Sequence, residues 1–195
     1  MAAVRIETAE LGLPAVDALE TDALAVFVGP ERPLQGLAGF VDWRLCGLLS
    51  RAIRDGSYDP DAGETLLLPS GGRLLVPRIF CFGTASPPRD AASFSVLVRR
   101  LCHALHKAGS ASWAGALPDV ARHVSLPGPR LFLQALLPVP PRSVVLLGDA
   151  HTLQRDLVAA REALGGPDVE IVSPSVRVEM PGRAARLHHP GAVIR

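Results

Sequence analysis

The sequence predicts a three-layer α/β fold, in which helices cover both faces of a mixed, largely parallel central sheet. Two observations lead to this prediction. Short apolar runs, most of them closed by glycine or proline, alternate with longer stretches whose apolar residues recur at helical spacing. That order is typical of parallel sheets, because the chain needs a crossover, usually a helix, before it can start the next parallel strand. The length of 195 residues suits one domain with a tail.

The strand prediction depends on apolar runs rich in Val, Ile, Leu and Phe. These runs occupy residues 22–28, 64–68, 78–82 and 142–147, with a weaker run at 112–117 and an edge strand at 169–172. Runs of this kind are typical of strands that are buried on both faces. The residues that we expect in buried strands are Val26, Val28, Leu67, Ile79, Phe80, Val145 and Leu146.

Helices are predicted at residues 37–54, 89–108, 130–137 and 151–164. In the first of these, the apolar residues share one helical face, and Asp55-Gly56 ends the helix because glycine readily adopts the left-handed cap conformation. The helix at 89–108 is entered through Pro87-Pro88, and the helix at 151–164 is stopped by two glycines and a proline.

The chain is divided into a folded domain at residues 1–165 and a tail at residues 166–195. Proline, glycine and charged residues are frequent in the tail, which leaves little apolar surface to offset the entropy of ordering. We therefore expect the residues after Pro174 to pack less tightly than the domain. A strand at 176–178 is allowed as an exception, because it could pair with a sheet edge of this chain or of a neighbour.

Composition excludes several classes of protein. The net charge of +1, with acids and bases interspersed, argues against nucleic acid and anionic membranes as partners. No apolar run approaches the roughly 18 residues of a membrane span, and residues 1–10 lack the apolar core of a signal peptide. Cys46, Cys81 and Cys102 are odd in number and widely spaced, so we expect reduced thiols in a cytoplasmic protein. The abundance of Ala, Leu, Arg, Pro and Gly is attributed to a GC-rich bacterial genome.

Small residues follow three of the predicted strands. Ligands of open α/β sheets bind at the carboxyl ends of the strands, where a glycine lets the backbone approach a ligand closely. The candidate ligand-binding residues at these ends are Gly29, Gly83, Thr84, Gly148 and Asp149. The alternative is that each glycine only ends its strand and turns the chain. Neither a Walker phosphate loop nor a G-x-G-x-x-G pattern is present.

No metal site or catalytic site is predicted. Cys102, His103 and His106 are the nearest approach to a metal cluster, but a structural zinc site needs about four ligands, so we expect a core cysteine and solvated histidines. The acidic residues between Asp55 and Glu64 do not fit the spacing of an EF-hand and are interpreted as a polar loop. A G-x-S-x-G motif is absent. We therefore expect no catalytic residue, no metal and no cofactor.

Several short motifs occur in a fixed order along the chain. They are the run 22–28, Pro33-Leu34, Val41-Asp42, Leu48-Leu49, Asp55-Gly56, Gly-Glu-Thr-Leu-Leu-Leu at 63–68, and Arg-Ile-Phe-Cys-Phe-Gly at 78–83. This order and spacing resemble the amino-terminal domain of M17 leucyl aminopeptidases. The strand at 142–147 and the following helix resemble the last strand and helix of that domain, so the resemblance covers about residues 4–165.

The resemblance implies a macro-domain-like fold without the half of the family that carries catalysis. The catalytic lysine, the ligands for two metals and the Asn-Thr-Asp-Ala-Glu-Gly-Arg-Leu motif lie in the carboxyl-terminal domain of that family. This chain lacks the motif, and its only lysine is Lys107. We therefore expect a stand-alone, non-catalytic protein with an interaction or regulatory role, whose partner is a separately encoded protein or a second copy. The alternative is a macro-domain-like binder of an ADP-ribose-type or other small ligand. A cryptic hydrolase that uses Cys or Ser is a third reading, with no positive sign in the sequence.

Overall fold

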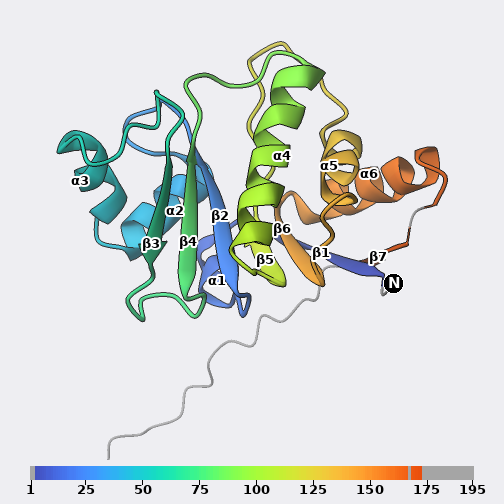
Figure 1. The fold of residues 1–195 in the computed structure, drawn as a ribbon, viewed down its shortest axis with the longest axis horizontal. Coiled ribbons are helices and arrows are strands. Elements are labelled where there is room, and N and C mark those ends of the chain that lie inside the picture. The colour runs from blue at the N-terminus through green and yellow to red at the C-terminus, as the bar shows by residue number, and fades with distance from the viewer. Residues whose placement is uncertain (1–2, 167, 173–195) are drawn as a thin grey trace, which may run out of the picture.

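The computed structural model describes residues 3–166 and 168–172. A seven-stranded sheet runs through this part of the chain in the order β3-β4-β2-β5-β6-β1-β7 (Figure 1). The strands are β1 (Val4–Glu10), β2 (Ala23–Val28), β3 (Thr65–Pro69), β4 (Arg78–Gly83), β5 (Ser112–Gly115), β6 (Ser143–Gly148) and β7 (Val169–Val172). All neighbouring strands pair in parallel except β3 and β4, which are antiparallel. The mixed, largely parallel sheet that the sequence predicts is therefore confirmed.

Helices cover both faces of the sheet, which confirms the predicted three layers. The helices are α1 (Leu13–Asp17), α2 (Gly36–Arg44), α3 (Leu48–Arg54), α4 (Ala91–Lys107), α5 (Gly128–Leu136) and α6 (Ala150–Ala163). The first three pack on one face around Val16, Val41 and Leu49, and the last three pack on the other face around Phe94, Phe132 and Leu157. None of the helices in the described residues is long and apolar enough to cross a membrane.

Two elements near the amino terminus are not among the predicted ones. β1 lies between β6 and β7, well inside the sheet. Its side chains alternate between the core and a more exposed face, with Val4, Ile6 and Thr8 buried. Alternation of this kind is typical of a strand. The sequence does not predict this strand clearly, because two of the intervening residues are charged and the run is short. The short helix α1 follows and carries the chain over the sheet to β2.

The helix predicted at residues 37–54 is in fact two helices. Cys46 and Gly47 both have positive φ angles, of 54° and 75°, so the right-handed helix cannot continue through them. The N–H of Gly47 donates to the Asp42 carbonyl oxygen over 2.8 Å, and the Asp42 carboxylate accepts the Ser50 N–H at the start of α3. The single-helix prediction was wrong because the apolar face continues across a break that only the backbone conformation reveals.

Burial of the strand residues is confirmed for five of the seven, namely Val26, Val28, Ile79, Phe80 and Leu146. Val145 is only partly buried. Leu67 is 53% exposed, so its predicted burial was wrong. The reason is topological, because β3 is the edge strand of the sheet and the face that carries Leu67 is left uncovered.

The predicted edge strand at 169–172 is confirmed as β7, which pairs in parallel with β1. The division into a domain at 1–165 and a tail at 166–195 stays a prediction. The allowed strand at 176–178 and the looser packing after Pro174 fall outside the described residues.

A reciprocal pair of hydrogen bonds joins the starts of β2 and β5. The Asp22 carboxylate accepts the Ser112 N–H over 2.8 Å, and the Asp22 N–H donates to the Ser112 hydroxyl over 3.1 Å. The bond from the Ser112 N–H is the main reason why the pKa of Asp22 lies below its usual value. A carboxyl group whose pKa is lower in the folded protein stabilises the fold above about pH 4 and loses that contribution as the pH falls further.

We expect Asp22→Asn to lower the free energy of unfolding by about 1 kcal/mol at neutral pH, the usual scale of one hydrogen bond. The difference between wild type and variant should shrink as the pH falls below about 4, because the wild-type carboxyl becomes protonated. Urea unfolding between pH 3 and 7 measures both effects. Asp55→Asn, at an exposed ion pair with Arg54, is the control. An Asp22→Asn difference that stays constant with pH would contradict the assignment.

Candidate functional site

The carboxyl ends of the parallel strands meet at one edge of the sheet, which is where the sequence places a ligand site. Gly29 follows β2, and Gly83 and Thr84 end the neighbouring strand β4. Gly148 and Asp149 end β6, which is separated from β2 by β5. The five candidate residues therefore form two groups, one at β2 and β4 and the other at β6.

In the first group, Thr84 fastens the end of β4 to the end of β2. Its N–H and its hydroxyl both donate to the Val28 carbonyl oxygen, over 2.9 and 3.2 Å, and the residue is buried. Beside it, the guanidinium group of Arg32 donates to the carbonyl oxygens of Gly29 and Glu31, each over 2.8 Å. The polar groups of this strand end are thus engaged by the chain itself.

Gly83 allows a close approach of the backbone, but the approaching group belongs to this chain. A Cβ atom at Gly83 would lie 2.5 Å from the Cα and from the carbonyl oxygen of Pro60. The Gly83 N–H donates to the Glu64 carbonyl oxygen over 2.8 Å, so the loop before β3 lies against the end of β4. Packing therefore requires a glycine here, whether or not a ligand also binds.

At the end of β6, where the second group lies, the space around the candidate residues is also filled by the chain itself. A Cβ atom at Gly148 would lie 2.7 Å from the Leu153 side chain, and the Gly148 carbonyl oxygen accepts the Leu11 N–H. The Asp149 carboxylate accepts the Thr152 N–H over 2.8 Å, and this bond holds the pKa of Asp149 below its usual value. The Glu10 carboxylate accepts the Ala150 N–H over 3.2 Å. Two carboxylates of the chain therefore sit at the amino terminus of α6.

The amino terminus of α4 is also closed by a carboxylate. Asp90 accepts the Ser93 N–H over 2.7 Å, and the Ser93 hydroxyl accepts the Asp90 N–H in a reciprocal capping box. These bonds to Ser93 hold the pKa of Asp90 below its usual value. Helix amino termini attract anions through their free N–H groups. At α4 and α6 this place is taken by the negative side chains of the chain.

A further acidic pair near these strand ends was not predicted from the sequence. Asp119 lies in the loop after β5, and Glu31 lies in the loop after β2. Partial desolvation raises the pKa of Asp119, and the negative charge of Glu31 raises it further. The two residues are far apart in the sequence and no motif joins them, so only the fold reveals their proximity.

Tyr58 is a second residue that the sequence did not single out. It is 1% exposed, and its hydroxyl has no hydrogen-bond partner within the described residues. Burial raises the pKa of Tyr58, and the neighbouring Cys81 thiol adds to the effect. The ring packs with Leu49 and Val28 in the core beneath α2 and α3, so we assign it a packing role.

The residues that could have held a metal have other roles. Cys102 is buried in the core, as predicted, and burial raises the pKa of its thiol to about 12. His103 and His106 are exposed. In the acidic loop, Asp59 accepts the N–H groups of residues 61 and 62, and Glu64 accepts the Asp59 N–H, so these carboxylates hold a polar loop together. No group of three or more His, Cys, Asp or Glu side chains in the described residues could hold a metal ion.

Two surface depressions lie elsewhere on the molecule. One, of about 650 Å³, lies beside α2, where the exposed Trp43 ring stacks under the Arg44 guanidinium group. The other, of about 260 Å³, lies at the amino ends of β5 and β6 and is lined by Cys102, His106 and Trp113 among others. None of the five predicted strand-end residues lines either depression.

Solved structures share this arrangement of strands and helices. Tomato leucine aminopeptidase superposes with a TM-score of 0.59 and 17% identity, over 85% of this chain. The macro domain of ganglioside induced differentiation associated protein 2 also has a TM-score of 0.59, with 13% identity over 82% of this chain and 84% of that chain. The chain has a macro-domain-like fold. Its fold is similar to that of the amino-terminal domain of M17 aminopeptidases, as the sequence predicts.

The likeness extends to only part of the aminopeptidase. The macro-domain-like chain spans 37% of the tomato enzyme. The macrodomain of Thermus aquaticus DarG is similar over 98% of its own length and 74% of this chain, with a TM-score of 0.51 and 15% identity. No protein-family model and no curated protein matches the sequence. At these identities the likeness concerns the fold alone.

Proposed function

We propose that this chain is a non-catalytic relative of the aminopeptidase amino-terminal domain, and that it acts by binding another protein molecule. The observation that carries the proposal is that groups of the chain itself already occupy the strand ends. The chain's own loops, side chains and carboxylates occupy the edge of the sheet where this type of fold would hold a small ligand. Apolar side chains are exposed elsewhere, at Trp43, Leu67 and Leu75. Such side chains mark an interaction surface where they form a contiguous apolar patch.

The alternative, suggested by the macro-domain-like fold, is that the chain binds an ADP-ribose-type or other small ligand. A diphosphate needs N–H donors or cations at the strand ends. The Arg32 cation at this edge is already bonded to two carbonyl oxygens of the chain. Asp90, Asp149 and Glu10 cap the nearby helices, and Glu31 and Asp119 add negative charge. Electrostatic repulsion therefore weighs against an anionic ligand at this edge.

A titration and an activity assay test the small-molecule and peptidase readings. We expect no heat of binding when ADP-ribose is added to the purified protein up to about 1 mM, a concentration that would detect a weak site. We also expect no release of leucine from leucyl amides, with or without manganese or zinc. Hydrolysis by two metals needs clustered carboxylates, and in the acidic loop those of Asp59 and Glu64 are engaged with backbone N–H groups.

The control for contaminating host peptidase is the triple variant Asp59→Ala, Asp61→Ala, Glu64→Ala. Metal-dependent turnover that survives purification and disappears in this variant would contradict the non-catalytic proposal. Saturable ADP-ribose binding would favour the alternative instead.

The interaction role itself is tested by affinity purification followed by reconstitution. We expect the tagged chain to recover a defined protein, or a second tagged copy of itself, and the complex to form again from purified components. The absence of any reconstituted complex, with self-association also absent, would overturn the proposal.

A further inference from the structure

The outer side of β3 is an open edge of the sheet. Within the described residues β3 pairs with β4 and with no other strand. The Gly83 N–H donates to the Glu64 carbonyl oxygen, and the Ser70 N–H donates to the Pro77 carbonyl oxygen. Because antiparallel strands bond through alternate residues, the N–H and C=O groups of Thr65 and Leu67 point away from the sheet.

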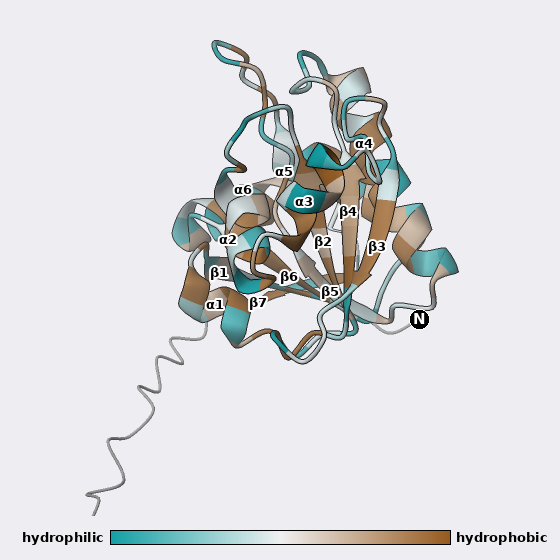
Figure 2. Ribbon diagram, turned by 90° about the vertical axis from the view of Figure 1, so that its left-hand side faces the viewer, coloured by the Kyte–Doolittle hydropathy of each residue, from teal (hydrophilic) through white to brown (hydrophobic). Residues whose placement is uncertain are grey.

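This edge lacks most of the features that prevent pairing with another chain. Charged side chains, bulges and interior prolines are the usual protection of an edge strand. β3 reads Thr-Leu-Leu-Leu-Pro, so it has no charge, and its proline removes a donor only at the last position. Leu67 is 53% exposed, and in Figure 2 β3 is seen as a hydrophobic strand that no helix covers from that side.

We propose that β3 pairs with β3 of a second copy of this chain, antiparallel about a twofold axis near Leu66 and Leu67. The pairing would join two seven-stranded sheets and satisfy the outward N–H and C=O groups of Thr65 and Leu67 in both copies. The inference rests on the proposed interaction role and names the partner.

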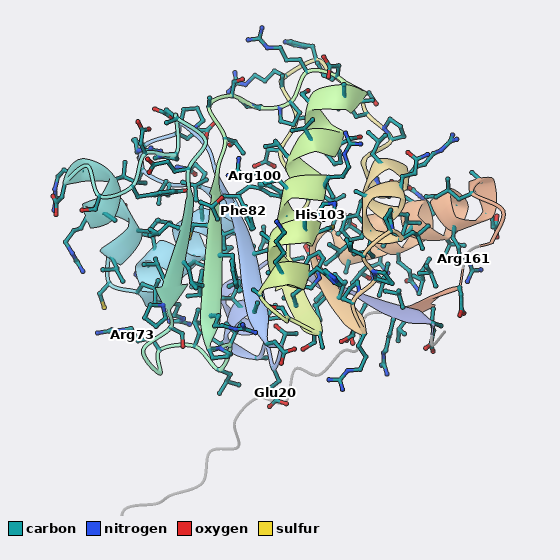
Figure 3. The ribbon with its side chains drawn as sticks, in the orientation of Figure 1. Glu20, Arg73, Phe82, Arg100, His103 and Arg161 are labelled. Atoms are coloured by element: carbon teal, nitrogen blue, oxygen red, sulfur yellow. The ribbon has the colours of Figure 1, made fainter. Side chains whose placement is uncertain are left out.

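Charge supports a second copy as the occupant. The exposed Asp61 precedes β3, and the exposed Arg73 follows it in the connection to β4. Figure 3 shows Arg73 near the end of the β3–β4 hairpin, at the opposite end of these strands from Arg100. An antiparallel twofold pair brings the acidic end of one β3 to the basic end of the other, twice. β3 is thus complementary to itself in charge.

The other edge strand among the described residues, β7, fits less well. β7 carries Glu170 in its centre, and a charge on an edge strand disfavours pairing. Pairing β3 with β7 of another copy would also leave an open edge on each copy and produce filaments. Pairing β3 with β3 uses the same edge of both copies, so the assembly stops at a dimer.

Hydrogen exchange combined with solution mass tests the pairing on the intact chain. Light scattering should show a species of twice the monomer mass of 20.6 kDa. In that dimer the Thr65 and Leu67 amides should exchange slowly, whereas in a monomer they would face solvent. The Leu66 and Leu68 amides, which lie on the β4 side, report that the strand itself is folded.

The variant Leu67→Lys should raise the dissociation constant of the dimer by at least about tenfold, because it places two ammonium groups near the axis. Since Leu67 is half exposed, the fold should tolerate the change. Glu162→Gln changes the net charge by the same amount on α6, over the far end of the sheet, and should leave the dimer unchanged. Asp61→Arg and Arg73→Asp should each weaken the dimer, and the double variant should restore it.

Three results would overturn the proposal. The first is a monomer at about 100 µM, a concentration at which weak interfaces are still populated. The second is an oligomer larger than a dimer. The third is a monomer whose Thr65 and Leu67 amides are protected from exchange. The last result would mean that another segment of the same chain covers β3. These outcomes leave the interaction role standing if a different protein is recovered and reconstituted, so failure of the β3 pairing and failure of the proposed function are distinguishable.

Discussion

Gly83→Ala is expected to lower the free energy of unfolding by about 2–3 kcal/mol, the upper part of the usual range for overpacking. The added Cβ would lie 2.5 Å from two backbone atoms of Pro60, a distance at which something must move. Pro60 cannot retreat freely, because Gly63 and Glu64 bond back to Pro60 and Asp59, and Gly83 itself bonds to Glu64. The substitution therefore strains both the strand end and the loop. Urea unfolding measures the loss.

Gly12→Ala is the matched control. Gly12 also lies at the edge of an element, but its φ is −171°, which any residue adopts, and its added Cβ would come only within 3.6 Å of Pro14. We expect a change below about 0.5 kcal/mol, as for most surface substitutions. Equal losses in the two variants would show that the close approach of Pro60 does not require a glycine at position 83.

Periodicity and turn residues were sufficient to predict most of the fold. β2, β4 and β6 were predictable because strands buried on both faces are continuous apolar runs that end at glycine. β1 was not, because its buried Val4, Ile6 and Thr8 alternate with charged and partly exposed residues in a short run. The break at Cys46 and Gly47 depends on positive φ angles that the apolar pattern does not reveal, because that pattern runs straight through it.

The sequence predicted where the strands end, but not what surrounds those ends. Gly83 and Gly148 do end parallel strands at their carboxyl edge, as their position after apolar runs indicates. What approaches each glycine is decided by tertiary structure, because Pro60 and Leu153 reach them through loops and helices that local sequence does not position. The neighbouring charges of Glu31 and Asp119 and the exposed side chain of Leu67 depend on strand order in the same way.

Phe132→Ala is expected to lower the free energy of unfolding by about 3–5 kcal/mol, the usual cost of removing a buried aromatic ring. Phe132 lies on α5 with only 2% of its surface exposed, and its ring meets the Trp113 ring edge-on at a centroid distance of 6.1 Å. The substitution removes that aromatic contact and leaves a cavity between α5 and β5, because close-packed neighbours relax only in part.

Trp43→Ala is the control for Phe132→Ala, since it also replaces a helical aromatic residue by alanine. Trp43 is 62% exposed, and the Arg44 guanidinium group lies over its ring, 4.5 Å from the centroid. We expect a loss of about 1 kcal/mol or less, the scale of an exposed cation–π contact. Both variants are compared by urea unfolding. Because domains of this size have a total stability of only about 5–15 kcal/mol, Phe132→Ala should shift the midpoint strongly. A loss for Phe132→Ala no greater than that for Trp43→Ala would show that α5 does not pack on the sheet through this ring.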